Sequence, residues 1–163
     1  MHFRAVDFFL WCEDTGFAHW IKGSTWVFPI VETLHIIGLT VLLGTMIVVD
    51  LRLLGFGMRH QSAAQLAREV APWSWAALVG MVGTGVMLFM SEAVRLYSSS
   101  PFFYKMGFLF LAIVLHCTLH RRAILDAEES AWRRRLAASL SLACWLGVAF
   151  AGRVIAFTGD RFR

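Results

Sequence analysis

The sequence predicts an all-α polytopic membrane protein, with four transmembrane helices in a bundle and an amphipathic interfacial helix at the N-terminus. Of the 163 residues, 58% are hydrophobic and 16% are charged, whereas globular chains average roughly 45–50% apolar and about 25% charged residues. The apolar residues gather in long runs, each near or above the ~20 residues that cross a bilayer as a helix. Aromatic residues such as Trp26, Trp73 and Trp132 mark the ends of these runs, as in the aromatic belts at lipid headgroups.

The elements can be placed in order along the chain. The N-terminal segment, residues 2–22, has apolar side chains at helical spacing but no run long enough to span, which is typical of a helix lying in the membrane interface. The second apolar run contains the stretch GMVGTG, whose small residues predict close helix packing in lipid. A charged stretch before the last run, DAEESAWRRR, predicts a helical elbow outside the membrane. We expect one domain over residues 1–163, with spans at 25–54, 73–97, 102–120 and 136–157.

The basic residues predict how the bundle is oriented. Clusters lie in the first connection, which holds Arg52, Arg59 and Arg68, and in the third, which holds the HRR and WRRR motifs. Because cytoplasmic loops carry an excess of Lys and Arg, these connections are expected in the cytoplasm and both termini in the periplasm. The sequence pI of about 9.4 follows from these clusters beside the spans, so it indicates membrane topology rather than nucleic-acid binding.

Charged residues inside the apolar runs predict a buried polar site. Glu32 and His35 lie one turn apart on one face of the first span. A charge at the centre of a bilayer costs roughly 3 kcal/mol on insertion scales, so such groups usually face the bundle interior and find partners. Counting depth from the outer ends brings Arg153, Lys105 and Glu92 to the same half of the membrane. We expect a cluster of these five residues, with Glu32 and Arg153 as an ion pair. The alternative is an internal clamp that only fixes helix register.

A second polar group falls in the cytoplasmic half and contains Asp50, Arg52, His116 and His120. The i, i+4 spacing of the two histidines would place both imidazoles on one helical face, as metal ligation requires. The candidate metal ligands are therefore His35, His116 and His120, whereas Asp50 and Arg52 are expected to be structural. Histidines at an interface beside an arginine pair are also common without any ligand.

The histidines also raise the question of b-type haem. Ligation by two histidines needs both at one depth on facing helices, but His35 and His116 differ by ~7 Å from the outer ends at 1.5 Å per residue. Met87 lies at a better-matched depth, although a methionine in an apolar helix usually serves packing. Cys12, Cys117 and Cys144 show no CxxC or CxxCH spacing, which argues against a cysteine-based zinc site or c-type haem.

Several segments together resemble a known family. They are PIVETLHIIGLTVLLGTMIVVDLRLLG, APWSW, TGVMLFMSEAVR, PFFYKMGFLFLAI and SLACWLGVAFAGRVIAF, and they resemble a bacterial family of small four-helix inner-membrane proteins that is catalogued as a domain of unknown function. The resemblance implies that its characteristic polar positions are Glu32, His35, Asp50, Arg52, Lys105 and Arg153, whereas the family pattern has Asn where this chain has His116. The architecture has a more distant likeness to cytochrome-b-like and copper-resistance membrane bundles.

Three functions are consistent with these features. The first is a redox-associated subunit of the bacterial inner membrane that binds quinone or haem b, since a quinone needs an apolar slot, a hydrogen-bonding histidine and a carboxylate. The second is an oligomeric transporter or channel for a metal ion or small solute. The third is a structural or assembly subunit of a larger membrane complex. The expected partners are the lipid bilayer and either further copies of the chain or other subunits, with no nucleic acid, and the sequence assigns no catalytic residue.

Overall fold

The computed structural model describes residues 5–57, 60–120 and 130–158, and these residues form helices and short connections without a strand. Four helices are long and apolar enough to cross a membrane, so the predicted all-α, multi-pass membrane fold is confirmed. In chain order, the helices are α1 (Ala5–Glu13), α2 (Gly16–Gly23), α3 (Val27–Leu54), α4 (Ala63–Ser91), α5 (Ala93–Tyr97), α6 (Ser100–Leu115), the π-helical turn η1 (His116–His120) and α8 (Ala131–Thr158).

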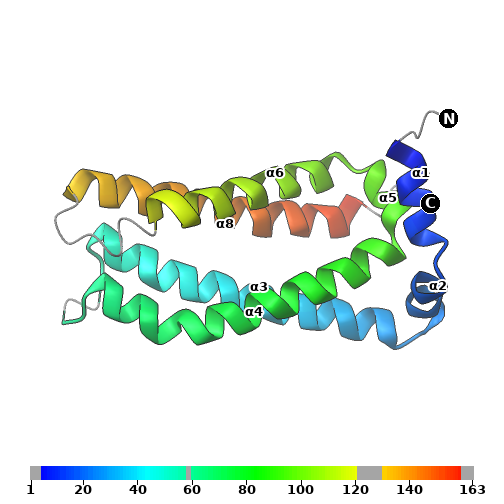
Figure 1. Ribbon diagram of the computed structural model, residues 1–163, viewed down its shortest axis with the longest axis horizontal. Helices are drawn as coiled ribbons and strands as arrows, with labels where there is room; N and C mark the ends of the chain where they lie inside the picture. The colour runs from blue at the N-terminus through cyan, green and yellow to red at the C-terminus, as the bar shows by residue number, and fades with distance from the viewer. Residues whose placement is uncertain (1–4, 58–59, 121–129, 159–163) are drawn as a thin grey trace.

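The four long helices run antiparallel in sequence order (Figure 1). Helices α1, α2 and α5 gather at one end of the bundle, together with the start of α3 and the end of α8, and we call this the terminal end. The connection from α3 to α4 lies at the opposite end. Helices α3 and α4 form one closely packed pair, α6 and α8 form a second, and the pairs are joined mainly where α3 packs against α8.

Local capping explains where the second long helix differs from its predicted span. Helix α4 begins at Ala63 rather than near residue 73, because Ser62 and Gln65 form a capping box that satisfies backbone groups of the first turn. Its first turns carry the exposed Arg68 and Glu69, so hydropathy alone misses them. At the other end, the backbone breaks at Glu92, and the short α5 follows in place of a continuous helix to residue 97.

The N-terminal segment forms two helices rather than the single helix expected over residues 2–22. Helix α1 ends at Glu13, and the Thr15 side chain caps α2 by accepting a hydrogen bond of 3.2 Å from the Ala18 N–H. The two helices cover the terminal end of the bundle (Figure 1). Exposed aromatic side chains on them, including Trp11 and Trp20, are suited to the membrane interface. Residues 2–4 of the expected helix lie outside the described residues.

Glycines permit the closest approaches between the long helices. A Cβ on Gly38 of α3 would lie 2.9 Å from the Met81 side chain of α4, and one on Gly147 of α8 would lie 2.9–3.1 Å from the Phe108 ring of α6. Packing of this kind replaces the hydrophobic drive between helices in lipid. In the GMVGTG stretch, Gly85 is in a close contact, whereas a Cβ on Gly80 or Gly83 would meet nothing within 4 Å.

Candidate functional site

The centre of the candidate site is a hydrogen bond between the two helices of the first pair. His35 of α3 and Thr84 of α4 approach with 2.9 Å between the imidazole Nδ1 and the hydroxyl Oγ1. The imidazole is half-buried between the helices. Its close fit depends on Gly85, where an added Cβ would lie 3.2 Å from the His35 Cε1 atom. The position of His35 is therefore set by α4 and not only by its own helix.

The hydrogen bonds of Thr84 favour one tautomer of the neutral His35 imidazole. The Thr84 hydroxyl lies 2.7 Å from the Gly80 carbonyl oxygen of its own helix and donates its single proton there. The same oxygen can then only accept from His35, so Nδ1 carries the hydrogen and donates. In the neutral ring, Nε2 then carries the lone pair, and none of the described residues donates a hydrogen bond to it. His35 is thus prepared to accept a hydrogen bond or to ligate.

Lys105 supplies a positive charge to the same interior. This lysine starts the second turn of α6, and its ammonium group lies along Gly152 of α8, where an added Cβ would be 3.8 Å from Nζ. The ammonium is also near enough to act electrostatically on His35. Among the described residues, Lys105 forms no ion pair with a carboxylate. The interior therefore combines an acceptor nitrogen with a cation that can donate three hydrogen bonds.

Glu32 and Arg153 do not form the ion pair that the sequence predicts. Both side chains are exposed, and within the described residues no ion pair joins them. The guanidinium of Arg153 instead lies over the ring of Phe157, 4.9 Å from its centroid, in a cation–π contact within α8. The expected Glu32–Arg153 ion pair is therefore not formed in this structure.

Glu92 lies at the rim of the site, where the backbone breaks between α4 and α5. Its carboxylate is paired with the guanidinium of Arg95 one turn later. Partial burial raises the pKa of Glu92 above its usual range, and the nearby carboxylate of Glu32 adds to this, against the opposing charges of Arg95 and Lys22. The five residues predicted as one cluster thus form an interior group, an exposed pair and a rim carboxylate.

The polar residues of the opposite end do not extend this group. Asp50 is completely buried, and Arg52 donates from Nε to the Gln61 carbonyl oxygen over 2.7 Å, which ties the end of α3 to the next connection. His116 and His120 begin and end a π-helical turn, in which bonds run from i to i+5.

A shared metal site is likewise not assembled in the described part of the chain. No three His, Cys, Asp or Glu side chains gather there closely enough to hold a metal ion. His35 lies near the terminal end of α3, whereas His116 follows the last residue of α6 toward the other end. The side chain of His120, together with Arg59, Arg121 and Arg122 of the topology prediction, falls outside the described residues.

Sequence reasoning missed two residues that build this end of the molecule. Thr84 was seen only as part of a small-residue stretch, although a hydroxyl inside an apolar run is a signal for hydrogen bonding across helices. Glu13 was not singled out, yet its carboxylate accepts from the Val94 N–H of α5 over 2.9 Å and pairs with Lys22 of α2 over 2.5 Å. Glu13 thereby ties α1 to both neighbouring short helices.

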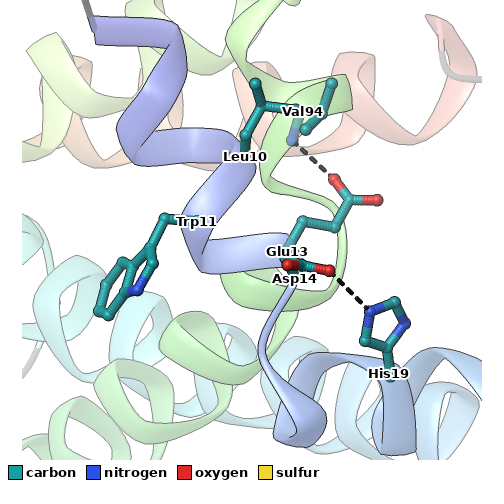
Figure 2. Close-up of a pocket in the computed structure, with 6 residues that line it drawn as sticks. All are labelled: Leu10, Trp11, Glu13, Asp14, His19 and Val94. Carbon is teal, nitrogen blue, oxygen red and sulfur yellow. Dashed lines mark hydrogen bonds and ion pairs between the residues drawn. The ribbon is translucent and has the colours of Figure 1, made fainter. Parts of the chain in front are cut away.

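The contacts of Glu13 lie beside an open groove at the terminal end. Figure 2 shows Glu13 reaching the backbone of Val94, while Asp14 faces His19 at 3.5 Å. The groove has a volume of about 470 Å³ and is lined by Leu10, Trp11, Glu13, Asp14, His19 and Val94. Its polar side chains already form hydrogen bonds with other residues of the groove. We therefore interpret the groove as the boundary between the short helices and not as a second ligand-binding site.

Comparison with known proteins bears on the family but on no activity. Curated proteins and solved structures give no match to the chain. A family model matches residues 8–158, which includes every long helix and all the polar positions described above. The resemblance to a family catalogued as a domain of unknown function is thereby confirmed. The chain belongs to the family of unknown function DUF6644.

Proposed function

We propose that the interior group of His35, Thr84 and Lys105 binds the headgroup of a quinone or quinol, and that the protein is a redox-associated subunit of the bacterial inner membrane. The observation that carries this proposal is the Thr84 hydrogen bond, which holds the His35 imidazole with Nε2 as an acceptor. A quinol hydroxyl would donate to Nε2, and a quinone carbonyl would accept from the Lys105 ammonium. An apolar bundle with a few convergent polar groups is the usual form of such a site.

The rim carboxylate fits the same proposal. Quinol oxidation releases protons, and quinone reduction takes them up, so a quinone site needs a group that exchanges protons with the aqueous phase. Glu92 lies at the end of α4, where the pKa of its carboxyl is raised by burial. A raised pKa brings a carboxyl closer to neutral pH and improves it as a proton carrier. We propose Glu92 as the exit for protons at the terminal end, which the arginine placement favours as periplasmic.

Haem b is the second ligand that His35 could hold. A histidine ligand usually donates its other ring N–H to a neighbour, and Thr84 meets that requirement. Haem ligation by two histidines needs a second histidine at the depth of His35. His116 does not meet this need, because it follows the last residue of α6, far from the terminal end where His35 lies. Lys105, whose charge acts on the imidazole, has no role in haem ligation, whereas its ammonium could donate to a quinone carbonyl. Quinone is therefore the better-supported ligand.

The test is the composition of the protein purified from its own membrane in mild detergent. We expect an extractable quinone in at least a substantial fraction of molecules and no Soret absorbance. His35→Leu should lose the quinone at normal yield, whereas His19→Gln, at an exposed histidine of α2, should keep it. A Soret band would favour haem. Equal quinone in His35→Leu and the parent, or none in the parent after quinone is supplied, would refute the proposal and favour the transport or assembly alternatives.

A further inference from the structure

Two polar side chains of α8 lie in the core of the bundle, each with a polar atom that no protein group satisfies. Ser141 is 1% exposed and Trp145 is 4% exposed, and among the described residues nothing bonds to the Ser141 Oγ or to the Trp145 Nε1 atom. The two residues are one helical turn apart, so both side chains lie on the same face of α8. Buried polar groups nearly always have a partner, either in the protein or in a bound water molecule.

Other hydroxyls of the long helices are satisfied by the carbonyl groups of their own helix. Ser91 of α4 donates to a carbonyl oxygen one turn earlier over 2.9 Å, and Thr45 of α3 does the same over 2.8 Å. Ser141 makes no such bond within α8, so its hydroxyl remains available to a ligand. Trp145 has no solution of this kind, because an indole N–H is only a donor and lies at the end of a rigid side chain, away from the carbonyls of its own helix.

Ser141 and Trp145 lie where two apolar clusters of the core meet. One cluster contains Trp145 together with residues of α3, α4 and α6, and the other contains Ala138 of α8 together with Val49 of α3. Ser141 lies between Ala138 and Trp145 along α8, and the completely buried Asp50 directly follows Val49 along α3. Since α3 and α8 pack against each other, both helices bring buried polar side chains to the junction of the two clusters.

A water molecule is the ligand that these groups fit. Trp145 needs an acceptor, whereas the Ser141 hydroxyl can donate or accept, and a buried water molecule typically makes about three hydrogen bonds to such groups. A third bond can go to the Asp50 carboxylate, because a carboxylate accepts several hydrogen bonds at once. An apolar ligand such as a lipid tail would offer no acceptor. At ~1.5 Å per residue, Ser141 lies ~15 Å from the start of α8 and ~25 Å from its end, deep within the span.

We propose that α8 holds a bound water molecule in the middle of the bundle, which accepts a hydrogen bond from the Trp145 Nε1 atom and shares another with the Ser141 Oγ atom. This site is separate from the interior group. Lys105 of that group lies beside Gly152, which is ~10 Å beyond Trp145 along α8. The inference therefore does not depend on the ligand of the interior group.

The test is proton-detected solid-state NMR of the full chain in lipid bilayers, with nitrogen-15-labelled tryptophan. Trp145→Phe identifies the Trp145 indole signal among the 7 tryptophans, and the exposed Trp132 is the positive control for contact with water. We expect magnetisation transfer from a water proton to the Trp145 indole N–H in the parent. Ser141→Ala should reduce this transfer about threefold or more, because the water molecule loses a partner. Ser139→Ala, at an exposed position two residues earlier in α8, is the matched control and should leave the transfer unchanged.

Two results would overturn the proposal. One is a parent protein in which the Trp145 indole N–H receives no magnetisation from water while the Trp132 indole does, since the protein itself would then supply the acceptor. The other is transfer in Ser141→Ala equal to that in the parent, since the two side chains would then not share a water molecule. The first result needs no variant at Ser141. If Ser141→Ala does not fold, Ser141→Cys takes its place, because a thiol is a much weaker hydrogen-bonding group than a hydroxyl.

Discussion

Replacing Thr84 with Val removes the hydroxyl that holds His35 and keeps the β-branched shape of the side chain. The variant loses one hydrogen bond of 2.9 Å between α3 and α4 and leaves the His35 N–H without its acceptor. Hydrogen bonds between membrane helices average ~0.6 kcal/mol, with a maximum of ~1.7, and a buried donor left unsatisfied costs ~1–3 kcal/mol. Since His35 is only half-buried, we expect a loss of about 1–1.5 kcal/mol in the free energy of unfolding.

The assay is reversible unfolding in mixed detergent and dodecyl sulfate micelles, arranged as a double-mutant cycle. Thr84→Ser retains the hydroxyl and should stay within about 0.5 kcal/mol of the parent. In a His35→Leu background, Thr84→Val should cost close to nothing, because the partner is already gone. Equal losses from Thr84→Val with and without His35 would refute the interhelical hydrogen bond. Equal losses from the Val and Ser variants would show that the Thr84 hydroxyl does not account for the loss in stability.

Two further predictions concern the packing of α6 against α8 and the docking of α1 at the terminal end. Gly147→Ala should cost about 1–3 kcal/mol in the same unfolding assay, because the new methyl would overlap the Phe108 ring. Gly44→Ala, where nothing lies within 4 Å, should cost nothing, and a similar loss in both would contradict this. Burial alone would raise the pKa of Glu13, but hydrogen bonds from Lys22 and a backbone N–H hold it below the usual value. The carboxylate should therefore stabilise the docking of α1 above about pH 4.5 and lose this effect as pH falls through the lowered pKa. Glu13→Gln should speed amide exchange in α1 at pH 7, with an effect that shrinks as the pH is lowered below about 4.5, and an effect independent of pH would disprove the ionic contribution.

The four transmembrane helices could be predicted because the hydropathy of each helix depends only on its own residues. Length and composition locate four apolar helices without any knowledge of neighbours. Their ends are less predictable, because they depend on local capping. Ser62 with Gln65 was a readable capping signal for α4, whereas the break at Glu92 lies inside an apolar stretch and has no comparable signal. The N-terminal segment divides at Asp14 and Thr15, where a cap residue was also readable.

The candidate site could be predicted only in part, because it depends on how helices rotate against each other. Depth counting placed His35, Lys105 and Glu92 at one end of the bundle correctly. It could not show that Glu32 and Arg153 would be exposed and form no ion pair with each other, since side-chain contacts between helices do not follow from depth. The partner of His35, Thr84, lies 49 residues away in the chain, and no spacing rule connects the two.

The most direct test of the proposed interior site is a binding titration of a short-chain quinone against the purified protein, followed by tryptophan fluorescence. Lys105→Met keeps the length of the side chain but removes the charge that would donate to a quinone carbonyl. Arg68→Met removes an exposed positive charge near the start of α4, at the opposite end of the bundle, and serves as the control. We predict saturable binding in the parent and the control and at least about tenfold weaker binding in Lys105→Met, which corresponds to the ~1.5–3 kcal/mol of a hydrogen bond from a charged donor. Saturable binding that is unchanged by Lys105→Met, or no binding to the parent, would contradict the account.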